Sequence, residues 1–122
     1  MKYNYQFPFE RYEIWNLSLE LSACVYKMTT SFPKEEKYVI TSQLRKASNS
    51  VGANIAEGLS RFSEKEKARF IEIAFGSLME VAHFLFLSKK LEMVDEDKFG
   101  DLKLKIQELS NKINAFHKKL DK

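Results

Sequence analysis

The apolar residues in the last quarter of the chain recur at alternating steps of three and four. This heptad pattern keeps all of its members on one face of a helix and suits left-handed packing against neighbouring helices. The chain contains only four Gly and two Pro, whereas sandwiches and barrels need many turns. The two observations together predict long helices. The heptad consists of Phe99, Leu102, Ile106, Leu109, Ile113, Phe116 and Leu120.

Three earlier segments also have helical spacing, so we predict an all-α, antiparallel up-and-down four-helix bundle. Pro33 can begin the second helix, because its missing N–H costs nothing at a first helical position. Gly58 is a natural stop for that helix. Ser63 and the Glu three residues later form a capping box for the third helix, and an acidic run beginning at Asp95 caps the fourth. The predicted helices span residues 9–31, 33–57, 64–91 and 97–120.

Each predicted helix has an inner face at steps of three and four. In the first helix this face is Tyr12, Trp15, Leu19, Ala23 and Tyr26. In the second it is Thr41, Leu44, Ser48, Val51, Ile55 and Leu59. The third has two adjacent seams, which are Ile71, Phe75, Leu78, Ala82 and Leu85, and Phe70, Ala74, Ser77, Val81 and Phe84.

The third segment is apolar almost all round between Phe70 and Leu87. A membrane span is one explanation, but Glu72, Glu80 and His83 interrupt the run, and an acid near the middle of a bilayer costs about 2.5 to 3.5 kcal/mol. A helix too apolar for a single contact face is instead expected to be buried on two sides. We therefore predict no membrane span, with one side of this helix packed in its own bundle and the other against a second subunit.

The stretch SNSVGANIAEGLSRFS, residues 48–63, is rich in weak helix formers. Ser48, Gly52 and Ala56 are four residues apart and form a small-residue row along which a neighbouring backbone can approach closely. The glycine spacing matches neither the P-loop motif G-x-x-x-x-G-K-[ST] nor the G-x-G-x-x-G motif that follows a strand in dinucleotide-binding proteins. The stretch is thus read as a tightly packed helix with a solvated polar back. In the alternative reading, part of the polar stripe makes hydrogen bonds across a subunit interface, through Asn54, Glu57 and Arg61.

The chain has 122 residues, 44% of them hydrophobic and 30% charged, which predicts one globular domain. We place that domain at residues 9–122, after an N-terminal tail at residues 1–8. The single Cys24 excludes an intrachain disulfide and a multi-cysteine zinc site, and it fits a reducing cytoplasm. The N-terminal residues lack the apolar core of a secretion signal, so we expect a cytoplasmic protein.

The sequence offers no clear catalytic or metal-binding constellation. Glu80 and His83 form one Glu-x-x-His motif, but a di-iron bundle needs a second copy, and His117 follows Asn114 instead. Cys24 has no base near it in the sequence and is expected to be a small core residue. We therefore predict no enzymatic activity, no cofactor, no metal and no small-molecule substrate.

Basic residues gather on the second predicted helix and the turn into the third. If they bind RNA, the contacts should be mainly to phosphate, sensitive to salt and weakly selective for sequence. The alternative is that these side chains only solvate the helix backs, and Glu64 and Glu66 dilute the cluster. The candidate nucleic-acid-binding residues are Arg45, Lys46, Arg61, Lys65, Lys67 and Arg69.

Four segments in order, RYEIW, SFPKEEKY, TSQLRKASNSVGANIAEG and RFIEIAFGSLMEV, resemble the 23S rRNA intervening-sequence family of four-helix-bundle proteins. The likeness runs from about Phe9 to Leu91 and is strongest between Ser42 and Gly58. In the fourth helix only the heptad agrees. Members are encoded within intervening sequences of bacterial large-subunit rRNA genes, or elsewhere in bacterial genomes.

The resemblance implies four antiparallel helices per subunit and a ring-like homopentamer without enzymatic activity. It also includes a related branch, the accessory variability proteins of diversity-generating retroelements, which bind a reverse transcriptase and nucleic acid through a basic surface. This chain is less basic than many members. After Gln43 its basic residues are only Arg45 and Lys46, which are followed by Ala47 and Ser48. Its formal net charge is +3, so a pentamer would carry about +15.

The resemblance thus implies a homo-oligomeric scaffold, five copies by analogy, that binds structured RNA or a ribonucleoprotein. The alternative is a protein-binding adaptor that makes no contact with nucleic acid. The apolar third helix and the polar stripe supply the candidate residues of the subunit interface, which are Asn54, Glu57, Met79, His83 and Phe86.

Overall fold

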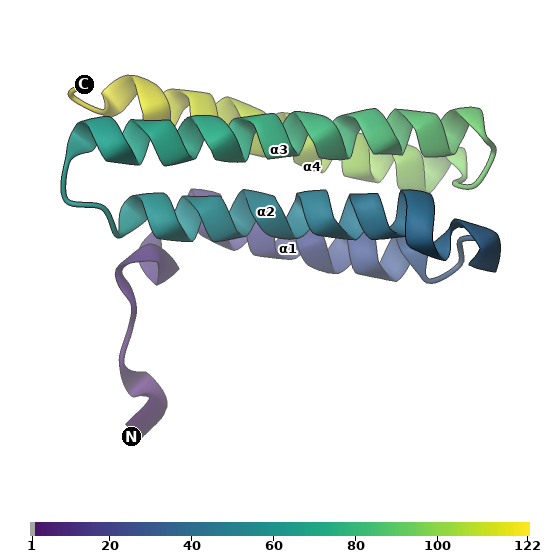
Figure 1. Cartoon of the computed structure of the whole chain (residues 1–122), viewed down its shortest axis with the longest axis horizontal. Coiled ribbons are helices and arrows are strands. Elements are labelled where there is room, and N and C mark those ends of the chain that lie inside the picture. Colours follow the sequence, from purple (N-terminus) through teal and green to yellow (C-terminus); the bar gives the residue numbers. More distant parts are fainter. Residues whose placement is uncertain (1) are drawn as a thin grey trace.

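The computed structural model describes residues 2–122, so Met1 of the predicted tail lies outside the described residues. Its main elements are α1 (Glu13–Thr29), α2 (Ser42–Leu59), α3 (Glu64–Lys90) and α4 (Glu96–Lys119). The helices lie side by side, each antiparallel to the next in the chain (Figure 1). The predicted all-α, antiparallel up-and-down four-helix bundle is thus confirmed, and residues 2–122 contain no strand.

The predicted residues cap the starts of the two long C-terminal helices, although Ser63 shows only the first of the two hydrogen bonds of the predicted capping box. The Ser63 hydroxyl accepts a hydrogen bond from the Glu66 backbone N–H at 3.1 Å. A carboxylate oxygen of Asp95 accepts one from the Lys98 backbone N–H at 2.8 Å. Both helices also carry acidic residues in the first turn and basic residues in the last, which complements the helix dipole. Local sequence signals therefore fix where α3 and α4 begin.

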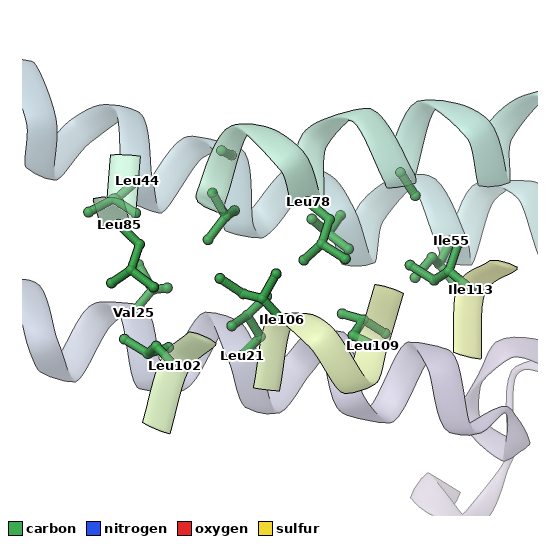
Figure 2. Close-up of a cluster of buried hydrophobic side chains, with 14 of the residues drawn as sticks. Leu21, Val25, Leu44, Ile55, Leu78, Leu85, Leu102, Ile106, Leu109 and Ile113 are labelled. Atoms are coloured by element: carbon green, nitrogen blue, oxygen red, sulfur yellow. The ribbon is translucent and has the colours of Figure 1, made fainter. Parts of the chain in front are cut away.

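Aliphatic side chains from all four helices meet along the axis of the bundle, and Figure 2 shows their interdigitation. The heptad of α4 is buried from Phe99 to Ile113, as predicted, while Phe116 and Leu120 at its end are half-buried. The largest fully buried side chains include Leu21, Leu44, Ile55, Ile71, Leu78, Leu85, Leu109 and Ile113. At about 1.5–3 kcal/mol for each buried side chain, this core is the main source of stability.

Both predicted seams of α3 point into the bundle. Ile71, Leu78 and Leu85 are buried in one seam, and Ala74 and Val81 in the other. Among the described elements, α3 is the one helix long and apolar enough to cross a membrane, judged by length and composition alone. In the fold, the buried residues of this apolar run lie in the core, where α3 packs against α2 and α4, while Ile73, Met79 and Phe86 are exposed.

The structure corrects the prediction for the first helix. A short 3-10 turn, η2 (Pro8–Arg11), precedes α1, which begins at Glu13 and not at Phe9. The predicted inner face is confirmed only at its start, where Tyr12 and Trp15 are half-buried against the core. It is wrong further along, since Leu19 and Tyr26 are 54% and 41% exposed and Ala23 is also exposed. The buried residues are instead Ile14, Ser18, Leu21, Val25, Met28 and Thr29. Two sets of residues have helical spacing here, and the more aliphatic set packs into the core.

The start of the second predicted helix is also different. Pro33 is extended, with ψ of 143°, as is usual for the residue before the first turn of a helix, and it follows the buried Phe32. A 3-10 turn, η3 (Lys34–Glu36), and one π-helical turn, η4 (Lys37–Thr41), come before α2. The spacing of apolar residues in the sequence does not predict the 3-10 turn or the π-helical turn. The predicted inner face of α2 is nevertheless confirmed, since all six of its residues are buried.

Two glycines of α2 allow neighbouring helices to approach closely. A Cβ atom at Gly52 would lie 2.8 Å from the Ser18 hydroxyl oxygen of α1, which confirms close packing along the predicted small-residue row. A Cβ atom at Gly58 would lie 2.7 Å from the Cβ of Phe70 on α3. Gly58 is inside α2, which continues to Leu59, so the prediction that it ends the helix is wrong. Its role is to make room for α3.

Candidate nucleic-acid interface

The six candidate nucleic-acid-binding residues do not form one cluster. Arg45 and Lys46 lie in the first turns of α2. Arg61 lies in the connection between α2 and α3, and Lys65 and the two basic residues after it lie in the first turns of α3; we call these four the basic group at the α2–α3 turn. At about 1.5 Å per residue, the length of α2 separates the two groups by roughly 20–25 Å. The predicted cluster is therefore two basic groups near opposite ends of the bundle (Figure 1).

Most of the basic group at the α2–α3 turn is paired with carboxylates of the same helices. Arg61 makes an ion pair with Glu57 at 2.9 Å, and its guanidinium lies 4.5 Å from the centre of the Phe70 ring. Weaker pairs join Lys67 to Glu64 at 3.9 Å and Arg69 to Glu66 at 3.7 Å. These pairs are exposed, and such pairs contribute about 0–1 kcal/mol to stability. They do, however, cancel much of the positive charge at this turn.

Arg45 is held in place by α1. Its Nε donates to the Thr29 hydroxyl at 2.9 Å, and its Nη2 donates to the Tyr26 carbonyl oxygen at 3.4 Å. The guanidinium lies 4.6 Å from the centre of the Tyr26 ring. No carboxylate within residues 2–122 forms an ion pair with Arg45 or Lys46. The charge at the start of α2 is thus oriented but not neutralised.

A hollow of about 240 Å³ lies beside Arg45, at the corner where the end of α1 meets the segment leading into α2. We call it the corner pocket. No acidic residue lines it, although Glu35 and Glu36 belong to the same connecting segment. The residues that define it here are Thr29, Phe32, Lys34, Lys37, Thr41 and Arg45. Sequence reasoning missed the pocket, because it expected one continuous helix through these positions.

The apolar candidates for a subunit interface share the outer face of α3. Met79 is 39% exposed and Phe86 51% exposed, and the exposed His83 lies between them at helical spacing. The Phe86 ring meets the Phe99 ring edge-on at 5.1 Å between centres. A long apolar side chain left in water along a helix face is what a subunit contact would cover. We refer to Met79, His83 and Phe86 as the outer α3 surface.

The polar candidates have partners within the chain. The Asn54 side-chain nitrogen donates to the Ser50 carbonyl oxygen at 2.8 Å and to the Ser50 hydroxyl at 3.0 Å. The Ser50 hydroxyl in turn lies 2.8 Å from that of Ser77, which links α2 to α3. Glu57 pairs with Arg61, as described above. The Asn54 amide nitrogen and the Glu57 carboxylate thus have partners within the chain without a second subunit.

The residues considered for metal or acid–base chemistry lie apart. Glu80 and His83 are exposed on the outside of α3, whereas the ligands of a di-iron bundle project inward. Nε2 of His117 on α4 lies 2.7 Å from a carboxylate oxygen of Glu72 on α3, and this pair ties the two helices together. Within residues 2–122, no group of three or more His, Cys, Asp or Glu side chains is placed to hold a metal ion. Cys24 is half-buried and packs against the core.

Comparison with known proteins identifies a family and similar solved structures. The family described as 23S rRNA-intervening sequence protein matches residues 10–115. A crystal structure of a protein of unknown function from the S23 ribosomal protein family of Bacteroides thetaiotaomicron VPI-5482 is similar, with a TM-score of 0.78. The two are 20% identical, and the alignment covers 86% of this chain and 98% of that one. Comparison with curated proteins gave no match.

Proposed function

The chain belongs to the 23S rRNA-intervening sequence protein family, and on that basis we propose that it is a non-catalytic scaffold of the bacterial cytoplasm. In this proposal several copies, five in the ring implied by the family resemblance, form a closed homo-oligomer. The oligomer binds structured RNA or a ribonucleoprotein through basic side chains. No reaction, cofactor or small-molecule substrate is part of the proposal.

The outer α3 surface supports the oligomer. Phe86 and Met79 leave large apolar side chains in water on a helix most of whose apolar residues are buried or half-buried. Ile73, 40% exposed, adds to the apolar area on the same helix. Covering such area with a second copy removes it from water at about 25 cal/mol per Å². In a closed ring every copy can cover this surface with a different surface of its neighbour, because the contacts of such a ring are head-to-tail.

The observation that carries RNA binding is the charge at the start of α2, where Arg45 and Lys46 have no carboxylate partner within residues 2–122. A single chain has a formal net charge of +3. In a ring of five, the same charge is repeated around the assembly and totals about +15. Repeated phosphate contacts of this kind give salt-sensitive binding with little sequence selectivity.

Filter binding of the purified protein to structured rRNA fragments tests the proposal. The measurement is made at about 50 mM and about 200 mM salt, since six to ten phosphate contacts would weaken binding by roughly 10³–10⁵ across that range. We expect binding at the lower salt that falls steeply at the higher. The RNA-binding part of the proposal is refuted by a lack of binding even at the lower salt.

The exposed apolar residues also favour a second candidate, a protein-binding adaptor. In this case Phe86 on α3 and Leu104 on α4, 51% and 65% exposed, would contact a partner protein. The two candidates differ in their dependence on RNA. A partner protein that co-purifies after complete nuclease treatment, from a chain that does not bind rRNA fragments, would favour the adaptor.

A further inference from the structure

We propose that the corner pocket binds a phosphate group, with Lys34, Lys37 and Arg45 supplying positive charge and Thr41 a hydroxyl. This inference deepens the proposed RNA binding and rests on it only for the source of the phosphate. Two sources share this chemistry, the RNA backbone and a free phosphate compound. The pocket is lined by residues at the end of α1, in the connecting segment and at the start of α2. This connection lies at the opposite end of the bundle from the α2–α3 turn (Figure 1).

Arg45 is prepared to bind an anion. A guanidinium has five N–H donors, and the contacts to Thr29 and Tyr26 use one on Nε and one on Nη2. Three donors remain, on the two terminal nitrogens, which form the fork that binds phosphate oxygens in pairs. Because Thr29 is buried and its hydroxyl donates to the Val25 carbonyl oxygen at 2.8 Å, the anchor of this fork is itself fixed.

Thr41 gives a second and independent indication of a ligand. It is 6% exposed and lines the pocket. Its hydroxyl makes no hydrogen bond to any of residues 2–122, although the other buried Ser and Thr hydroxyls each bond to a backbone carbonyl oxygen. No fully buried side-chain N or O atom of the described residues lacks a hydrogen-bond partner, so the Thr41 hydroxyl is reached by solvent and is free to bond a ligand in the pocket. A phosphate oxygen in the pocket would provide an acceptor.

The charge of the pocket is not cancelled. Lys34 and Lys37 form no ion pair with the carboxylates of residues 2–122, and no acidic residue lines the pocket. The α2–α3 turn differs, because Arg61, Lys67 and Arg69 there each face a glutamate within the same helix or turn. Of the two basic groups, the one beside the corner pocket is therefore the better anion site.

The size of the pocket suits one phosphate group. Its volume of about 240 Å³ is below the roughly 300–1,000 Å³ of sites for drug-sized ligands, yet well above the roughly 30 Å³ occupied by a water molecule.

The test uses the full chain and two double variants with equal change of charge. Lys34→Gln/Lys37→Gln removes two cations of the pocket without touching the core. The matched control is Lys118→Gln/Lys119→Gln, because these exposed lysines lie at the opposite end of the bundle and also lack an ion pair within the described chain. Each protein is assayed by filter binding to rRNA fragments over a range of salt. Its thermal midpoint is also measured in inorganic phosphate and in chloride of equal ionic strength.

We expect the pocket variant to bind RNA at least tenfold more weakly, with a salt slope smaller by about two, while the control stays within twofold of the parent chain. Inorganic phosphate should raise the thermal midpoint of the parent and the control but not of the pocket variant. If inorganic phosphate raises the thermal midpoint but no RNA binds, the pocket is supported as a site for a free phosphate compound. The same result refutes the RNA-binding function. RNA binding weakened equally in both variants, with no phosphate effect, overturns the pocket and leaves the proposed function standing. If neither ligand has any effect, both are overturned.

Discussion

Replacing Gly58 with Ala tests the close contact between α2 and α3. The new Cβ would lie 2.7 Å from the Cβ of Phe70 and 3.4 Å from the Lys67 carbonyl oxygen. The Cβ of Phe70 is attached directly to the backbone, so it cannot swing aside as the end of a flexible side chain can. Either α3 must move away from α2, or both helices must distort around the contact.

The size of the effect follows from two opposing terms. Inserting a methyl group into a well-packed contact costs about 1–3 kcal/mol. Ala is favoured over Gly in a helix by up to about 1 kcal/mol, which offsets part of this. The Gly58→Ala chain should therefore lose about 1–2 kcal/mol of unfolding free energy. For a chain of 122 residues, this lowers the thermal midpoint by roughly 3–5 °C per kcal/mol.

The matched control is Gly100→Ala in α4, where an added Cβ would meet nothing within 4 Å. This chain should gain up to about 1 kcal/mol from helix propensity alone. Urea unfolding followed by circular dichroism measures both variants, at one fixed protein concentration because association would shift the apparent stability. If Gly58→Ala proves as stable as Gly100→Ala, the inferred contact with Phe70 is wrong.

Three further substitutions test the core, a helix cap and the outer α3 surface. Leu78→Ala opens a cavity at a fully buried position and should lower the free energy of unfolding in urea by about 2–5 kcal/mol. An equal loss for Leu104→Ala, at a position that is 65% exposed, would contradict the assigned core. Asp95→Ala removes the acceptor for the Lys98 N–H and should cost about 1 kcal/mol, so an unchanged midpoint would speak against this cap. Met79→Glu/Phe86→Glu should reduce the mass measured by light scattering while the circular dichroism spectrum is kept, and an unchanged mass would show that the subunit contact lies elsewhere.

The sequence predicts α4 and the helix caps well, because the signals there are local. The heptad from Phe99 onward has a single apolar face, so helical spacing has one interpretation. The cap residues Ser63 and Asp95 precede acidic first turns, and each accepts the predicted backbone hydrogen bond. Where only one arrangement satisfies the local pattern, the fold follows it.

The inner face of α1 could not be predicted, because two faces compete. Trp15 and Tyr26 belong to a face with helical spacing, but so do Leu21 and Val25, which the structure buries completely. Only the positions of α2 and α4 decide between the two faces. In the same way, the 3-10 and π-helical turns before α2 arise from closing the core over Phe32, which is a tertiary requirement.

In the candidate site too, the local contacts could be predicted from the sequence and the contacts between helices could not. The ion pair of Glu57 with Arg61 spans four residues of the sequence, so its charge cancellation is visible as a helical spacing. The anchoring of Arg45 is different, since Thr29 and Tyr26 lie sixteen and nineteen residues away. No local pattern signals a contact between separate helices. The corner pocket therefore became apparent only from the fold.

The most direct measurement for the proposed scaffold is the mass of the purified chain by light scattering at micromolar concentration and moderate salt. A ring of five copies predicts a mass about five times the 14.3 kDa of one chain. Another whole-number multiple would keep the oligomer and change its number of copies. A mass of 14.3 kDa would show that the outer α3 surface stays uncovered, and it would contradict the homo-oligomeric scaffold.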